Sequence, residues 1–158
     1  MMDQAFKFII DSRMAFARML DDLSVDEINE VPDGFNNNIV WNFGHIVVST
    51  PILCYVRTGI WPDSSAIPFV EAYQKGTKPS YTVCADEVNE LRDLAVSTIR
   101  QVEDDYRNGL FARMKPFDTA TYGTTLGNFE ELLATTAGHD NLHFGYAMAQ
   151  KKIIKHSK

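Results

Sequence analysis

The chain has 158 residues, which is the length of one domain with a single sizeable core. Its composition, with 45% hydrophobic and 23% charged residues, is that of an ordinary globular protein and excludes a disordered or low-complexity chain. The net charge of -6 disfavours nucleic acid as a ligand, because duplex binding needs a basic face that displaces counterions.

The first segment has apolar residues at helical spacing, and this pattern predicts an amphipathic helix from Asp3 to Asp22. Arg13 falls near the middle of the apolar stripe of that helix. Ser24 and Glu27 follow at the spacing of a capping box, which predicts a second, short helix that Pro32 ends.

The second long helix is expected from Asn38 to Thr58 and is apolar nearly all round, which is typical of a helix covered on several sides. Pro51 lacks a backbone N–H and is therefore expected to kink this helix. A membrane span is disfavoured because the stretch carries polar residues, including Asn42, His45 and Ser49.

The connection from Gly59 to Ser80 is long for a compact domain, and a helical turn is expected within it at Phe69 to Gln74. A third amphipathic helix is predicted from Cys84 to Asn108, and a second connection follows from Leu110 to Gly127. The last helix is expected from Asn128 to Ile153 and begins with a variant of the capping box.

These long helices, with no convincing strand series among them, predict an all-α fold. The expected architecture is a four-helix bundle with a long crossover connection between helices two and three, in a single domain over residues 1–158. Cys54 and Cys84 form neither a CxxC pair nor a disulfide framework, so we expect both thiols to stay reduced. With no signal peptide recognised at the N-terminus, the expected location is the cytoplasm.

Three of the four histidines favour a metal site. His139 and His143 are four residues apart and therefore neighbours on one face of the last helix, the apolar one. His45 lies on the second long helix, and three imidazole nitrogens from facing helices make a divalent-metal site with open positions. Glycines beside these histidines suggest a close approach of helices around the site: Gly44, Gly138 and Gly145.

A structural explanation of these residues stays open, because buried histidines often do no more than hydrogen-bond to neighbours, and glycines fill tight helix crossings. The segment from His139 to His143 also invites comparison with the zinc-protease pattern HExxH. In this chain Asp140 replaces the Glu, and the third ligand expected downstream is lacking, so the comparison disfavours a protease.

Three further residues are candidates for the same site. Arg13 either forms an ion pair or clamps an anionic substrate, because a guanidinium matches a carboxylate bidentately. Trp41 belongs either to the core or to a cavity wall that contacts substrate. Asp140 either orients a ligand imidazole or pairs with a lysine.

The sequence resembles the DinB-like family of bundle proteins over nearly its whole length. The segment Pro32 to His45 contains the family's Trp-x-x-Gly-His pattern, and His139 to Gly145 contains its His-x-x-x-His-x-Gly pattern. The linker Phe69 to Ser80 is also similar to the middle region of the family. The resemblance implies a four-helix bundle in which a divalent metal, typically zinc or nickel, is bound by the triad His45, His139 and His143.

The resemblance further implies a metal-dependent enzyme that acts on a small-molecule substrate. It is either a thiol S-transferase, which uses a low-molecular-weight thiol such as bacillithiol, mycothiol or glutathione, or a hydrolase. We also expect a homodimer, and no membrane partner. The alternatives are a non-catalytic metal or small-ligand binding protein of the same fold, and a helical interaction module whose histidines are structural.

Because three protein ligands leave at least one position free, the metal is expected to face an open cavity. The walls of this cavity are expected to come from helices two and four, with Arg13 of helix one at its edge.

Overall fold

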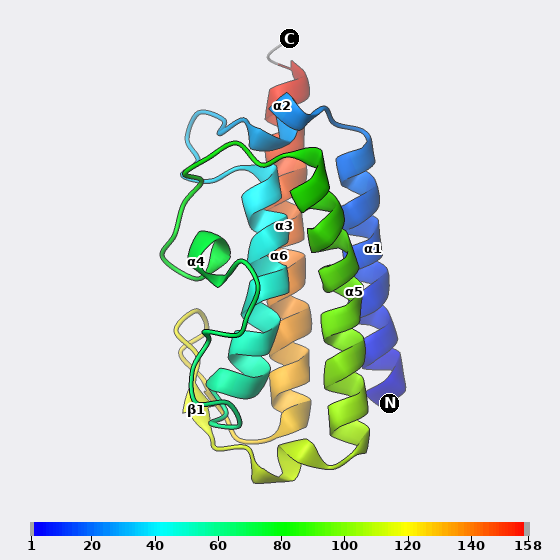
Figure 1. Cartoon of the computed structure of the whole chain (residues 1–158), viewed down its shortest axis with the longest axis vertical. Helices are drawn as coiled ribbons and strands as arrows, with labels where there is room; N and C mark the ends of the chain where they lie inside the picture. Colours follow the sequence, from blue (N-terminus) through cyan, green and yellow to red (C-terminus); the bar gives the residue numbers. More distant parts are fainter. Residues whose placement is uncertain (1, 157–158) are drawn as a thin grey trace.

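Four long helices form the body of the computed structural model, which describes residues 2–156 (Figure 1). They are α1 (Met2–Asp21), α3 (Ile39–Pro51), α5 (Ala85–Arg107) and α6 (Phe129–His156). Both α1 and α3 pack against α5 and against α6, so α1 and α3 occupy opposite corners of the bundle. The predicted all-α four-helix bundle is confirmed.

The long connection between α3 and α5 is the predicted crossover. It leaves the lower end of the bundle after α3 and returns the chain to the upper end, so that α3 and α5 run in the same direction (Figure 1). On its way it forms the single turn α4 (Val70–Tyr73), which packs against α3. A helical turn was expected at this point of the connection, and its position is confirmed.

The helix α3 is covered on several sides, because α2 (Val25–Asn29) and α4 pack on it as well as α5 and α6, and all of its residues are buried. Its apolar run continues past Pro51 as the π-helical turn η1 (Ile52–Val56). Pro51 has no N–H to give to the ladder, and the chain widens its hydrogen-bond pattern there, with the Arg57 N–H donating to the Ile52 carbonyl at 2.8 Å. The stretch Ile39–Val56 is apolar and long enough to cross a membrane, but 83% of it is buried, as in the core helix of a soluble fold.

The other elements are short. The helix α2 (Val25–Asn29) begins at the predicted capping box, in which Ser24 and Glu27 bond to each other's backbone N–H groups. After α5 the chain forms a 3-10 turn, η2 (Leu110–Arg113), and then an antiparallel hairpin of β1 (Phe117–Asp118) and β2 (Thr125–Leu126). The sequence analysis did not predict this hairpin, because strands of two residues are too short to show an alternating pattern.

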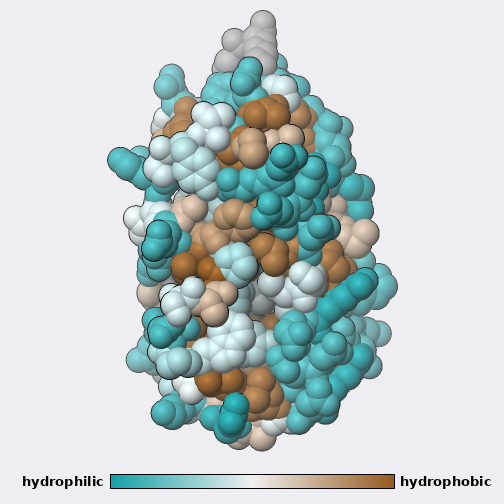
Figure 2. Space-filling view, in the orientation of Figure 1, coloured by the Kyte–Doolittle hydropathy of each residue, from teal (hydrophilic) through white to brown (hydrophobic). Residues whose placement is uncertain are grey.

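A polar layer separates two hydrophobic clusters in the bundle core. Along α1, Arg13 lies between Ile9 of one cluster and Phe16 of the other. Along α6, the buried Asp140 lies at the same level and bonds to Arg13. The surface over α5 is mainly hydrophilic, whereas hydrophobic side chains are interspersed towards the centre of the same view (Figure 2).

Candidate metal centre

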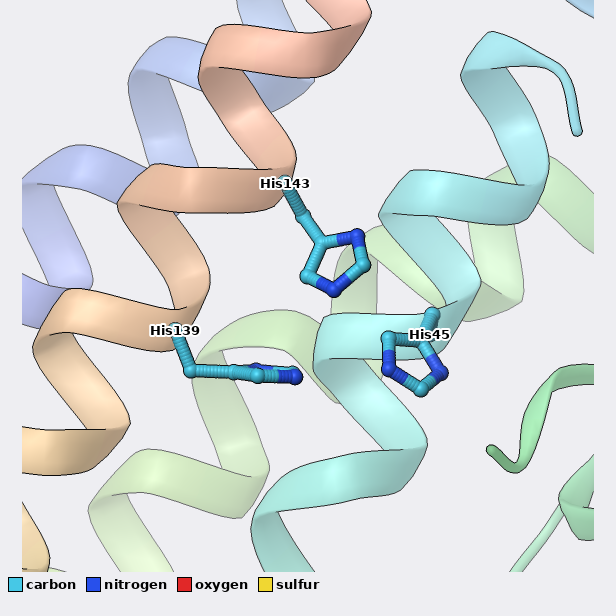
Figure 3. Close-up of side chains that lie close together, drawn as sticks. All are labelled: His45, His139 and His143. Atoms are coloured by element: carbon cyan, nitrogen blue, oxygen red, sulfur yellow. The ribbon is translucent and has the colours of Figure 1, made fainter. Parts of the chain in front are cut away.

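The side chains of His45, His139 and His143 converge in the space between α3 and α6 (Figure 3). Each offers a ring nitrogen within 4.8 Å of those of the other two. The ring centroids are 4.5 Å apart for His45 and His143, 4.6 Å for His139 and His143, and 5.1 Å for His45 and His139. Small movements of the side chains would therefore place one nitrogen of each ring about 2.0–2.1 Å from a shared metal ion, which is the distance at which imidazole binds zinc.

His45 is held by the backbone of α4. Its Nδ1 lies 2.6 Å from the Tyr73 carbonyl oxygen, so the neutral ring donates Nδ1–H and leaves Nε2 to face the other histidines. The Nε2 atom has a long contact of 3.3 Å with the Ser49 hydroxyl. The Trp41 ring stacks on the His45 ring with centroids 4.7 Å apart and planes at 10°, which fixes the ring plane.

Gly44 explains how the Tyr73 carbonyl reaches His45. A Cβ atom at position 44 would lie 2.6–2.7 Å from the Tyr73 ring, so only glycine lets α4 approach α3 this closely. Phe69 turns the chain into α4 with a φ of 60°, a value that a bulky residue rarely adopts. At the far end of the Tyr73 ring, the hydroxyl donates to the Glu87 carboxylate on α5.

His143 is held by a buried amide. Its Nδ1 lies 2.8 Å from Oδ1 of Asn42, which fixes His143 as an Nδ1–H donor and leaves Nε2 free to bind a metal. The Asn42 amide nitrogen is itself bonded to Asn38, Asn37 and Gln150, and this fixes the orientation of the amide. Sequence reasoning missed this role of Asn42, although a polar residue in so apolar a helix was the available signal.

His139 and Asp140 contain two unsatisfied atoms. The Nδ1 atom of His139 and the Oδ1 atom of Asp140 are buried without a hydrogen-bond partner, and they lie 3.9 Å apart. A histidine that coordinates through Nε2 donates Nδ1–H to a carboxylate in many metal sites, and Asp140 supplies such an acceptor. The donor set and these two orphaned atoms therefore fit a divalent metal at the triad.

The electrostatics also suit metal binding, because ligand imidazoles must be neutral. Burial lowers the pKa of His45 to about 4, and the hydrogen bond to Tyr73 only partly opposes this. Burial, followed by the nearby charges of His45 and His139, lowers the pKa of His143 to about 3. Both rings are therefore neutral at pH 7, and protons do not compete with a metal there.

A cavity of about 400 Å³ opens next to the triad. As predicted, α3 and α6 supply walls, and Trp41 is part of the lining. The hairpin after η2 and the loop that follows α4 also contribute, including Tyr122 and Lys75, and so do η1 and the residue that follows it, Arg57. A contact between Trp41 and substrate stays a prediction. The indole N–H of Trp41 already donates to the Thr77 hydroxyl at 3.0 Å and is therefore not free to bind a substrate.

The structure corrects the expectation that Arg13 lies at the edge of this cavity and binds an anion. The Arg13 side chain is buried in the bundle core, 1% exposed, and its Nε lies 2.6 Å from Oδ2 of Asp140. Its other N–H groups donate to acceptors of the protein itself: the Ile46 and Ala95 carbonyls and the Thr50 and Thr98 hydroxyls. A guanidinium has five N–H groups, and all five are used.

Two other expectations are also corrected. Asp140 pairs with an arginine rather than with a lysine. Of the three glycines beside the histidines, only Gly44 permits a close approach, because a Cβ at Gly145 would meet nothing within 4 Å and one at Gly138 would make only an ordinary contact. The expected inertness of Cys54 agrees with the structure, since burial raises the pKa of its thiol to about 12.

A comparison with protein families matches the chain to the DinB superfamily over residues 9–147. The matched residues include all three histidines and the Arg13–Asp140 pair. No curated protein matches the chain.

Proposed function

The chain belongs to the DinB superfamily, and we propose that it is a metal-dependent enzyme that transfers a low-molecular-weight thiol to a small electrophilic substrate. The observation that carries this proposal is the convergence of His45, His139 and His143 on the lining of an open cavity. Three imidazole donors suit zinc or nickel and leave a coordination position towards the cavity, as in catalytic rather than structural zinc sites.

When bound, such a cation supplies Lewis-acid chemistry, because it lowers the pKa of a coordinated thiol or water. The residues of the chain supply the rest. Tyr73 and Asn42 hold His45 and His143 with their Nε2 atoms towards the cavity. The cavity walls exclude part of the solvent and orient the substrate.

The lining of the cavity favours thiol transfer over hydrolysis. Metal-dependent hydrolysis generally uses a carboxylate beside the metal as general base, as in the HExxH proteases. Within residues 2–156, the one carboxylate that lines the cavity is Asp118 of the hairpin, and it accepts a hydrogen bond from Thr125 at 2.6 Å. A thiol that loses its proton on binding a metal needs no such base.

The first experiment is metal analysis of protein purified without an affinity tag. We expect about one zinc or nickel ion per chain. A second experiment adds an excess of thiol and a bimane electrophile and follows loss of the electrophile. Turnover that needs the metal supports the proposal. One metal per chain with no turnover for any thiol would favour the non-catalytic binding protein, and absence of metal uptake would leave the histidines structural.

The cellular setting remains part of the same proposal. Cys54 and Cys84 are both free thiols, as a reducing cytoplasm would keep them. Homodimer formation stays a prediction that sedimentation can test.

A further inference from the structure

Two cationic side chains, Arg57 and Lys75, line the cavity that contains the histidine triad. They come from separate parts of the chain: Arg57 directly follows η1, and Lys75 follows α4. Neither has a part in holding the histidines, and the metal centre leaves both unexplained.

Arg57 is exposed and contacts the hairpin. Its Nη2 donates to the Asp118 carbonyl at 2.8 Å, and its guanidinium carbon lies 5.1 Å from the centroid of the Phe117 ring. These contacts restrain the side chain without neutralising it, since a carbonyl and an aromatic face carry no net charge. In the part of the chain that the structure describes, Arg57 forms no ion pair, and its remaining N–H groups have no protein acceptor.

Lys75 is also without a carboxylate partner within residues 2–156. Its exposed side chain lines the same cavity as His45, His139 and His143. By contrast, Lys151 and Lys155 at the end of α6 are paired with Asp22 and Glu27.

The charge of the cavity is therefore opposite to that of the whole protein. The chain carries a net charge of -6, whereas the described cavity lining has two cations, Arg57 and Lys75, against the single carboxylate of Asp118. Low-dielectric walls strengthen such a local field and raise the concentration of ions of the opposite sign. Those walls include the apolar side chains of Ile52, Leu53 and Leu142.

We propose that Arg57 and Lys75 form a subsite for the carboxylate of a small organic acid whose apolar body lies along these walls and whose reactive end reaches the histidines. The guanidinium fork of Arg57 suits the two oxygens of a carboxylate, and the ammonium of Lys75 adds a second positive charge on the same lining. The inference rests on the proposed function in that the carboxylate belongs to one of the two reactants, the thiol or its acceptor.

The first test compares two thiols of similar length, 3-mercaptopropionate and 2-mercaptoethanol, on the cobalt-substituted protein, with thiolate binding followed by visible absorption. We expect the carboxylate thiol to bind about tenfold more tightly. Arg57→Gln and Lys75→Gln should each weaken it about fivefold, and the double variant more than tenfold, with less than a twofold change for 2-mercaptoethanol.

Matched controls remove the same charges elsewhere. Arg100→Gln and Lys152→Gln alter exposed cations on α5 and α6 that do not line the cavity, and they should leave both affinities unchanged. Because Arg57 also restrains the hairpin, Arg57→Lys keeps the charge and should retain more affinity for 3-mercaptopropionate than Arg57→Gln does.

A second arm needs neither metal nor thiol. Hexanoate and the uncharged hexanamide are titrated into the metal-free protein, with binding followed by amide chemical shifts. Loss of hexanoate binding in the double variant supports the subsite even if no thiol binds cobalt, in which case the thiol transferase proposal alone fails. Equal binding of hexanoate and hexanamide, no binding of hexanoate, or an unchanged hexanoate affinity in the double variant would overturn the subsite and leave the metal centre intact.

Discussion

Two polar sites on α6 stand next to each other in sequence and differ in how fully the protein satisfies them. Asp140 points into the bundle core and pairs with Arg13, whose five N–H groups all find acceptors within the protein. His139 and His143 lie on the neighbouring face, towards the cavity, and each keeps a ring nitrogen with no partner among the described residues.

The difference separates a structural site from a binding site. The Arg13 guanidinium has no donor left for a ligand, and its removal acts on folding, whereas Asp140 keeps one oxygen, Oδ1, as an acceptor for the His139 ring. Imidazoles that keep a ring nitrogen without a partner in the protein offer that nitrogen to a ligand, and two of the three, His45 and His143, are also oriented by a hydrogen bond at Nδ1. The two sites should therefore respond to substitution in opposite ways, and the following experiments are arranged from the largest expected effect to the smallest.

The largest effect is expected at the triad. His143→Ala removes one of three donors, so metal content should fall from about one ion per chain to near zero, while the bundle stays folded because its core lies elsewhere. Elemental analysis and circular dichroism measure the two quantities. His156→Ala, at the exposed end of α6, is the control and should keep its metal. Unchanged metal content in His143→Ala would remove the distinction between the two sites.

The opposite response is expected at the ion pair. Arg13→Met leaves the Asp140 carboxylate buried and unpaired, and breaking such a pair destabilises a protein by about 3–5 kcal/mol. Chemical denaturation of the metal-free protein measures this loss. The double variant Arg13→Met/Asp140→Leu should recover much of it, because no uncompensated charge remains. If Arg13→Met instead weakened ligand binding with unchanged stability, Arg13 would belong to the binding site after all.

Much of the fold could be predicted from the sequence, because α1 and α5 have clear apolar stripes, α3 is apolar nearly all round, and the helix ends are recognisable. The expected third helix, Cys84 to Asn108, differs from α5 by one residue at each end, since both end residues act as caps. The hairpin could not be predicted, because its strands are too short to show a pattern. A hydrogen bond within the connecting loop, from the Thr119 N–H to the Thr124 carbonyl at 2.8 Å, holds them together, and a sequence does not show such a bond.

The site could be predicted only in part. The spacing of His139 and His143 placed both on one face, and the Gly44–His45 pair identified the third imidazole. The Tyr73 carbonyl that orients His45 is a backbone group, and a sequence does not show which carbonyl a folded connection brings to a ring. Arg13 was ambiguous for a related reason, because its stripe position fits a buried pair and a cavity edge equally well.

A third experiment follows stability with pH. The pKa values of His45 and His143 in the folded protein, about 4 and about 3, lie below the value of about 6.5 expected in the unfolded chain. As the pH falls from 7 towards 4, the unfolded chain takes up these protons first, so the metal-free protein should lose stability. Each histidine contributes at most about 1.4 kcal/mol per pH unit. The double variant His45→Gln/His143→Gln should show a flatter dependence, and an identical one would contradict the pKa shifts.

The fourth experiment acts on the support of the triad rather than on a ligand. Gly44→Ala places a Cβ against the Tyr73 ring and should move the carbonyl that holds His45. Loss of a group that orients a metal ligand typically lowers metal affinity about 10–100-fold, and we expect the lower end of that range because the Tyr73 side chain can shift in part. Competition with a chromophoric chelator measures the affinity.

Gly145→Ala is the matched substitution on α6, and it carries the smallest expected effect. Its Cβ would meet nothing within 4 Å, so the gain in helix propensity should stabilise the bundle by about 0.5–1 kcal/mol with metal affinity unchanged. The two variants add the same methyl group to a helical glycine next to the triad, and only one of them meets a residue that orients a histidine. If Gly145→Ala lowered metal affinity as much as Gly44→Ala, local helix backbone rather than the Tyr73 contact would control the geometry of the site.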